Sequence, residues 1–429
     1  MLASGGLLIA LGTVGESRQW RHFRVLARNL PASDKFTVCP NPFANAIYRI
    51  GTKLTQPFLF ELDVATKLVN PTPGSIYSTP KEKRWRVLNR VGLFTLVIPI
   101  IAGVMATLGF CFRAVGAAFR PPVSLLRNKS LPFKQVSPGD SIHIRTYNTG
   151  LMPPVINNLN NLRSPNTRAF HIGHSSSGPD VICFQEGFDL RATSTLCEEL
   201  SHHFALVIHS VVPRETGMGS GLIIATNFRV EAVSFTAFSS RGGEDALANK
   251  GVLGVTLKFD DKRNIQLFNT HLQAKEGRKY DEIRVKQVEQ LAAIAKQDSD
   301  CVATVVAGDL NISPYNSKGE LNARFYQAKG LLKGFTNVYD LDHHPDGRRK
   351  KDLSAIESKS SWYSQSKESG WGTTDWKQAT GPTGYILDHI FVAPRAAALS
   401  STSQIENPKY WGAQSGHSDH LPFSCHVTL

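Results

Sequence analysis

Cysteine is scarce in this sequence, and the few cysteines have no recognisable arrangement. The 429 residues include six cysteines, with no Cys-x-x-Cys pair and no cysteine–histidine cluster at zinc spacing. Internal repeats and low-complexity tracts are also absent. With 41% apolar and 19% charged residues, the composition excludes a disordered chain, a collagen-like chain and a disulfide mini-scaffold. The length allows a large hydrophobic core.

Acidic residues are scarce in the first third of the chain. Residues 1–139 hold 18 Lys+Arg and 5 Asp+Glu, whereas residues 140–429 hold 30 of each. A nucleic-acid-binding domain carries its basic excess where it binds the phosphate backbone. Here the basic residues flank the most apolar stretch instead, so we expect an anionic membrane surface as the partner and no nucleic acid. A generally basic surface of a soluble protein is the alternative.

One long stretch without charge lies in this basic region. It comprises the 22 residues 91–112, bounded by Arg90 and Arg113, and is long enough to cross a bilayer as a helix. A proline and two glycines interrupt it, so a re-entrant hairpin or a buried helix remains possible. We predict membrane association through this segment, within an N-terminal region of residues 1–135.

From residue 141 onward the pattern changes to short apolar or alternating runs that are typical of β-strands. Helices are expected at residues 192–201, 280–297 and 319–333. Strands outnumber helices and hairpin-like spacings dominate. The pattern predicts an α/β domain over residues 136–429, with two mixed, mainly antiparallel sheets flanked by helices.

Polar side chains recur where the apolar runs end or begin. They are Asn148, Gln185–Glu186, Asn269–His271, Asp309–Asn311, Asp388–His389 and Ser418–His420. Any one of them could simply form a turn. Together they supply hard oxygen ligands, histidines and amide donors, which suit Mg²⁺ and a phosphate ester.

This set, in this order, resembles the endonuclease/exonuclease/phosphatase superfamily over about residues 140–429. Within it, the sequence is most similar to the membrane-bound branch of the neutral sphingomyelinases. The supporting motifs are Phe-Gln-Glu-Gly-Phe-Asp (184–189), Asn-Thr-His-Leu-Gln-Ala (269–274) and Gly-Asp-Leu-Asn-Ile-Ser-Pro (308–314), with Arg284 and Gln287 on the next helix. Inositol 5-phosphatases usually have Tyr-Arg where this chain has Ile312-Ser313. The resemblance implies a DNase I-like four-layer sandwich, here preceded by the apolar membrane segment.

The resemblance also implies a metal site and a catalytic base. Glu186 and Asn148 would hold Mg²⁺, and Asp419 would lie near the metal. One carboxylate with phosphate and water is a normal shell for this ion. His420 would take a proton from the attacking water, with Asp388 as the partner that fixes its tautomer.

Further residues would act on the phosphate. Asp309 would position the water or His420, while Asn311 and His271 would donate hydrogen bonds to the phosphoryl group. Asp245 and Lys250 are similar to the Asp and Lys of a switch loop in the membrane-bound branch. Lys250 would contact phosphate or gate this loop; an ordinary surface ion pair is the alternative.

The expected activity is that of a Mg²⁺-dependent phosphodiesterase that hydrolyses sphingomyelin to ceramide and phosphocholine at a membrane surface. A phosphoinositide phosphatase, a nuclease of the same superfamily and a catalytically inert membrane scaffold are the alternatives. A polar loop at residues 343–380 carries four aromatic residues and has no counterpart in the resemblance.

Overall fold

The fold was analysed in a computed structural model of the whole chain. It describes residues 22–30, 32–37, 41–69, 99–117, 121–137, 139–153, 156–157, 164–211, 219–260, 263–275, 277–296, 301–314, 322–338, 387–394, 401–405, 418, 420 and 422–428. The aromatic loop predicted at residues 343–380 lies outside the described residues.

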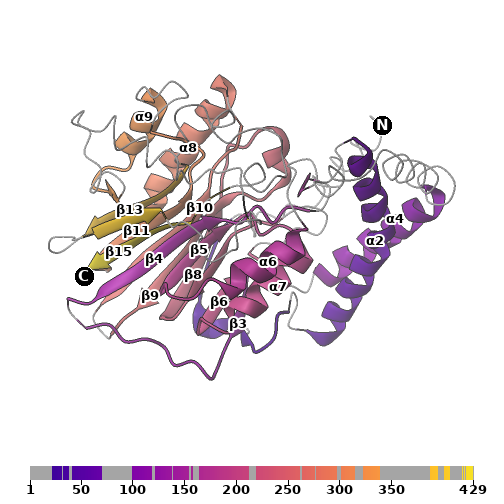
Figure 1. Cartoon of the computed structure of the whole chain (residues 1–429), viewed down its shortest axis with the longest axis horizontal. Helices are drawn as coiled ribbons and strands as arrows, with labels where there is room; N and C mark the ends of the chain where they lie inside the picture. The colour runs from indigo at the N-terminus through magenta and orange to yellow at the C-terminus, as the bar shows by residue number, and fades with distance from the viewer. Residues whose placement is uncertain are drawn as a thin grey trace, which may run out of the picture.

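Two mixed β-sheets form the centre of the molecule (Figure 1). The first sheet has the order β1 (His22–Leu26), β8 (Arg229–Ala237), β9 (Gly251–Lys258), β10 (Asn264–His271), β11 (Ala303–Asp309), β13 (Asp388–Pro394) and β12 (Thr336–Asn337). The second has the order β14 (Ser401–Ile405), β15 (Phe423–Thr428), β4 (Ser141–Asn148), β5 (Val181–Gln185), β7 (Ile223–Thr226), β6 (Leu206–His209), β3 (Ser124–Arg127) and β2 (Ala32–Ser33). The pairs β10–β11, β4–β5 and β2–β3 are parallel and the other pairs are antiparallel. The prediction of two mixed, mainly antiparallel sheets is confirmed.

Three layers of buried apolar side chains join four layers of secondary structure. The largest cluster lies between the two sheets. Every second residue of a strand faces inward, and many of these residues are Val, Ile, Leu or Phe. Helices α6 (Pro165–His174) and α7 (Leu190–Leu200) pack on the second sheet. Helices α8 (Arg278–Ala295) and α9 (Ala323–Leu331) pack on the first. The last three helices overlap the predicted ones, and the four-layer sandwich is confirmed.

The sandwich includes chain that precedes residue 136. Strand β1 pairs with β8 at the edge of the first sheet. Strands β2 and β3 pair with each other, and β3 also pairs with β6, at the edge of the second. The chain between β2 and β3 therefore leaves and returns at the same sheet edge.

The described residues of that intervening chain form two helices, α2 (Pro42–Val69) and α4 (Pro99–Ala117), which pack side by side (Figure 1). Small residues allow the close approach: a Cβ on Gly51 would lie 2.6 Å from Gly109 O, and one on Gly116 would lie 2.8 Å from Tyr48 Cβ. The two helices, named here the helical pair, also expose large apolar side chains: Phe43, Ile50, Val104, Leu108, Phe112 and Val115.

Among the described residues, no helix combines the length and apolarity needed to span a bilayer. Helix α4 continues past Arg113, whose guanidinium donates to Tyr48 Oη at 3.2 Å, so the charge expected to end the apolar segment lies inside the helix. Residues 91–98 of the predicted segment lie outside the described residues. The membrane segment stays a prediction.

Candidate active site

The topology gathers strand ends from both sheets at one rim. In the second sheet the parallel strands β4 and β5 end at Asn148 and Gln185. In the first sheet the parallel strands β10 and β11 end at His271 and Asp309. Antiparallel β13 begins at Asp388, directly opposite Asp309. Strand ends far apart in the sequence therefore meet in one place.

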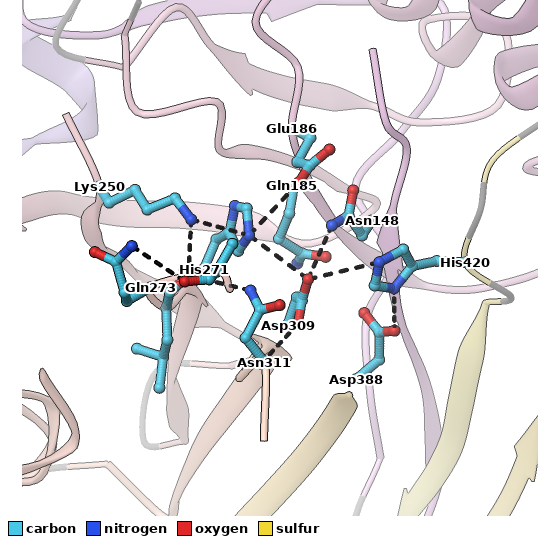
Figure 2. A network of polar contacts seen from close by, with 12 residues as sticks. Asn148, Gln185, Glu186, Lys250, His271, Gln273, Asp309, Asn311, Asp388 and His420 are labelled. Atoms are coloured by element: carbon cyan, nitrogen blue, oxygen red, sulfur yellow. Dashed lines mark hydrogen bonds and ion pairs between the residues drawn. The ribbon is translucent and has the colours of Figure 1, made fainter. Parts of the chain in front are cut away.

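A hydrogen bond between the sheets defines the centre of this rim (Figure 2). Asn148 Nδ2 donates to Asp309 Oδ2 at 2.9 Å, and both side chains are buried. Asn148 Oδ1 accepts from Gly150 N at 3.0 Å, while its backbone carbonyl accepts from Ser418 Oγ at 2.7 Å. These contacts fix the orientation of the Asn148 amide. Sequence reasoning placed Asn148 here but gave no role to Ser418.

Two further amides cross between the sheets behind Glu186. Gln185 Nε2 donates to Asn269 Oδ1 at 2.8 Å. Asn269 Nδ2 donates to the carbonyls of Phe184 and Ile223 at 2.9 and 3.0 Å. Glu186 itself has φ 61°, a left-handed conformation that is strained for a residue with a Cβ. The buried amides hold the chain at this turn, and the Glu186 side chain enters the network of Figure 2. Gln185 and Asn269 were visible in the sequence as polar residues at strand ends and within the motifs, but no role was predicted for either.

The predicted base and its predicted partner are in contact. His420 Nδ1 lies 2.8 Å from Asp388 Oδ2. Because a carboxylate only accepts hydrogen bonds, Nδ1 carries the proton and Nε2 is the basic nitrogen. Nε2 lies 3.8 Å from Asp309 Oδ2, on the side where Asn148 reaches the same oxygen.

The second histidine of the site, His271, lies on the other side of Asp309 (Figure 2). Its Nε2 is 3.6 Å from Glu186 Oε1 and 3.6 Å from Asp309 Oδ2. Burial lowers the pKa of His271 well below its ordinary value, and the charges of Lys250 and His420 lower it further. No described residue bonds to its Nδ1. His271 is therefore neutral near pH 7.

Lys250 is buried beside His271 and is only 1% exposed. Its Nζ donates to Asp245 Oδ2 at 2.8 Å and to Leu272 O at 2.7 Å, and it lies 3.2 Å from His271 Nε2. These three acceptors match the three donors of an ammonium group. The alternative of an ordinary surface ion pair does not fit this burial.

Asn311 and His389 make hydrogen bonds that hold the chain that follows β11. Asn311 has φ 51°; its backbone N donates to Asp309 Oδ1 at 2.8 Å and its Nδ2 to Leu272 O at 3.2 Å. The predicted phosphate donor therefore bonds to a backbone carbonyl here. His389 is buried, with Nε2 3.1 Å from Ile312 O and Nδ1 3.3 Å from Asn337 Nδ2. It is a structural residue, as its strand position predicts.

The carboxylate oxygens of the site fit a hard divalent cation, while the imidazole of His420 is paired with Asp388. Asp309, Asp388 and His420 offer ligand atoms within 4.8 Å of one another. Asp309 is 1% exposed and has no Lys or Arg partner among the described residues. A buried carboxylate without a compensating cation is costly, and Mg²⁺ binds such oxygens together with water. Glu186 and Asn148, the predicted ligands, lie in the same network, whereas predicted Asp419 lies outside the described residues.

These features together suit hydrolysis of a phosphate ester. A base with a fixed tautomer, carboxylates suited to a cation, and amide and cationic groups converge at one rim. Asn148, Asp309 and His420 lie together at the rim. If they lay on separate faces of the molecule, an inert scaffold would be the better interpretation.

Comparison with known proteins gives a family match. The model described as "Endonuclease/Exonuclease/phosphatase family" matches residues 146–420, which contain every strand-end group of the rim. A solved structure, that of SmcL, aligns with a TM-score of 0.51 at 20% sequence identity, covering 67% of this chain and 99% of that one. At this identity the likeness concerns the fold alone.

Two curated relatives are named as phosphodiesterases. Sphingomyelin phosphodiesterase 5 of Mus musculus is 35% identical over 155 residues, 31% of this chain and 31% of the relative. Sphingomyelin phosphodiesterase 3 of Rattus norvegicus is 24% identical over 295 residues, 58% of this chain and 45% of the relative. The chain thus matches about a third to a half of the length of these relatives.

Proposed function

The chain belongs to the endonuclease/exonuclease/phosphatase family, and we propose that it is a Mg²⁺-dependent phosphodiesterase that hydrolyses sphingomyelin to ceramide and phosphocholine. One observation carries the proposal for the chemistry. The His420–Asp388 pair from one part of the rim lies against Asp309, which Asn148 bonds from the other sheet. Attack of water on a phosphodiester needs a base that takes the proton of the water and a cation that stabilises the phosphate charge. A positioned base beside an oxygen-rich cation site meets both needs.

The proposed mechanism begins at His420. Its Nε2 takes a proton from water as the water oxygen forms a bond to phosphorus, and Asp388 stabilises the resulting imidazolium. The bond from phosphorus to the ceramide oxygen breaks, and that oxygen leaves with its electron pair and takes a proton from solvent water. His420 returns its extra proton to solvent, which restores the base. Phosphocholine and ceramide are the products.

Other residues would act on the charge of the transition state. Glu186 and Asn148 would hold Mg²⁺, which when bound supplies positive charge to the phosphoryl and leaving oxygens. His271 and Asn311 are proposed as phosphoryl donors. Asn311 would exchange Leu272 O for phosphate, and His271 would present a protonated ring nitrogen to it. Lys250 would place its positive charge behind His271.

The substrate assignment is supported by the relatives and by the motifs. Both relatives described above are named as sphingomyelin phosphodiesterases. The chain has Ile312-Ser313 after Gly-Asp-x-Asn, unlike the inositol 5-phosphatase pattern. The 140–429 region carries as many acidic as basic residues, which gives no basic excess for a nucleic acid.

We also propose that the helical pair attaches the protein to a membrane surface. Val104, Leu108, Phe112 and Val115 recur on one face of α4 and are 39–58% exposed. An apolar helix face of this kind can lie in the headgroup region of a bilayer without crossing it. The excess of Lys and Arg in residues 1–139 favours anionic lipids as the surface.

The test is an assay on sphingomyelin carrying a labelled choline group, in detergent mixed micelles, with Mg²⁺ or with EDTA. We expect phosphocholine release with Mg²⁺, none with EDTA, and none from His420→Ala in either condition. Absence of release at every Mg²⁺ concentration would reject the proposal. Release of inorganic phosphate from phosphoinositides, or nicking of plasmid DNA, would instead assign the site to one of the other reactions of the family.

A further inference from the structure

Residues 239–249, named here the switch-side loop, are attached to the active site by an unusual side-chain contact. Gly242 N donates to Gln273 Oε1 at 2.9 Å, and Gln273 Nε2 donates to Gly242 O at 3.1 Å. The side-chain amide therefore bonds to both polar groups of Gly242, as a neighbouring strand would. Gln273 is 1% exposed, so both bonds are shielded from water.

Gln273 is itself held firmly by α8. Its backbone N donates to Gln287 Oε1 at 2.8 Å, and its carbonyl accepts from Arg284 Nη1 at 2.8 Å. Gln287 Nε2 also donates to Ser240 O, at the start of the switch-side loop, at 2.8 Å. Both polar groups of the Gln273 backbone are thus fixed, and its side chain is a rigid anchor for the loop.

The anchored loop carries Asp245, the partner of Lys250. Asp245 Oδ2 accepts from Lys250 Nζ at 2.8 Å and from Ala274 N at 2.6 Å. Gln273 and Ala274 are neighbours, so two consecutive residues hold the loop at two points. The position of Asp245 fixes the ammonium group that lies 3.2 Å from His271 Nε2.

We propose that Gln273 is a positioning residue, which acts through Gly242 and Asp245 to keep the Lys250 ammonium group against His271. The inference rests on the proposed function for its effect on turnover, because it assigns a role within that same site. It goes beyond the motif resemblance, in which Gln273 has no role. Loss of the two bonds to Gly242 would leave the loop held by Asp245 and by the contacts of its first residues with α8. The Lys250 ammonium group behind His271 would then be held less firmly in place.

The informative substitution is Gln273→Glu. A carboxylate can still accept from Gly242 N but cannot donate to Gly242 O, so the second bond becomes a repulsion between two oxygens. Gln273→Met removes both bonds at similar volume and serves if the Glu variant does not fold. The matched control is Gln266→Glu on β10, the strand that ends two residues before Gln273. Gln266 is also buried, and it bonds to Thr256 away from the rim.

The first measurement is turnover of sphingomyelin in mixed micelles. We expect kcat to fall about 10²-fold in Gln273→Glu with KM within about threefold, because a misplaced charge acts on the transition state more than on binding. The control should keep its kcat. Combining Gln273→Glu with Asp245→Asn should lower kcat no further than the more severe single change, since both act through one contact. An unchanged kcat, or additive losses in the double variant, would overturn the proposal.

The second measurement does not depend on activity. Amide hydrogen exchange in residues 240–249 should become faster in Gln273→Glu and stay unchanged in Gln266→Glu. Unchanged exchange in both variants would overturn the positioning role. If the unmodified protein releases no phosphocholine, the proposed function fails, and the exchange comparison still decides whether Gln273 anchors the loop.

Discussion

His420 Nδ1 lies 2.8 Å from Asp388 Oδ2, and both side chains are buried at the rim shared by the two sheets. Asp388 begins β13, in register with Asp309 of β11, whereas His420 comes just before β15 of the other sheet. The protonation of His420, the proposed base, is therefore set by a contact between two segments that belong to different sheets. This relationship leads to the first prediction.

Replacing Asp388 by Asn should remove most turnover. An amide can donate to His420 Nδ1, which moves the imidazole proton to Nε2 and abolishes the base. We expect kcat to fall about 10²–10⁴-fold, as in His420→Ala. Steady-state phosphocholine release measures the loss, and thermal unfolding of each variant shows whether the fold is retained. Near-normal turnover in a folded His420→Ala variant would show that another group is the base.

Replacing Glu186 by Gln should raise the Mg²⁺ concentration that activity requires. An amide oxygen lacks the charge that attracts a divalent cation, so the Mg²⁺ concentration for half-maximal activity should rise at least about 10-fold. Excess Mg²⁺ should restore part of the activity. The control is Glu282→Gln, a largely exposed residue on α8 that should leave the Mg²⁺ requirement unchanged. Equal Mg²⁺ titrations for both variants would exclude Glu186 as a ligand.

Replacing Lys250 by Met should lower kcat roughly 10²-fold. Methionine keeps most of the length of the side chain but removes the ammonium group that contacts Asp245, Leu272 O and His271. Lys279→Met, on the exposed side of α8, is the control and should have no effect. If Lys250→Met retains full kcat with an intact fold, the lysine serves only to hold the loop.

Removing the helical pair should separate membrane binding from catalysis. We predict that replacing residues 41–117 by a Gly/Ser linker of about 12 residues leaves turnover on micelles intact and reduces activity on anionic bilayers. Co-sedimentation with vesicles of anionic or neutral lipid measures the binding. Undiminished binding to the vesicles after this replacement would show that another surface attaches the protein.

A deletion of residues 1–135 is the contrasting variant. It removes β1, β2 and β3, which pair at the edges of both sheets. We therefore expect it to unfold at a lower temperature than the variant that lacks only the helical pair. Equal thermal stability of the two would mean that these edge strands add little to the fold.

The stability of the fold should depend on pH through His209. Burial lowers the pKa of His209 to about 3, while in the unfolded chain it titrates near about 6.5. Between these values only the unfolded chain binds the proton, so the free energy of unfolding falls as the pH falls, by up to about 1.4 kcal/mol per pH unit. Urea unfolding at pH 6.5 and pH 5 measures this change in the free energy of unfolding. The decrease between the two pH values should be smaller in His209→Phe than in the unmodified protein. The exposed His202→Gln variant should lose stability as the unmodified protein does.

The central fold could be predicted because its signals are local. Alternating apolar residues mark the strands, and α7 to α9 have periodic apolar faces. Helix α6 was missed because one of its buried positions is Arg168, whose guanidinium bonds to backbone carbonyls and looks polar in the sequence. Strands β1 to β3 were missed because each is short and its partner is distant in the chain; His22, for example, pairs with Thr236.

The site could be predicted to a similar extent. Each group that ends a strand was visible as a polar residue after an apolar run, and Asn148, Asp309 and His420 do converge. The roles of two supporting amides were not predictable, although both residues appear among the motifs. Gln273 and Gln287 act through backbone atoms of residues that carry no chemical signal in the sequence, such as Gly242 and Ser240.

The hydrogen bond between Asn148 and Asp309 joins the two sheets, so its length depends on the distance between them at the rim. Ala307, two positions before Asp309, is buried in the core between the sheets. Because such a core is closely packed, it has no space for a larger side chain at this position. A bulkier side chain at this position would increase the distance between the two sheets at the rim without unfolding either sheet. The packing of the interior between the sheets is therefore expected to set the distance between Asn148 and Asp309.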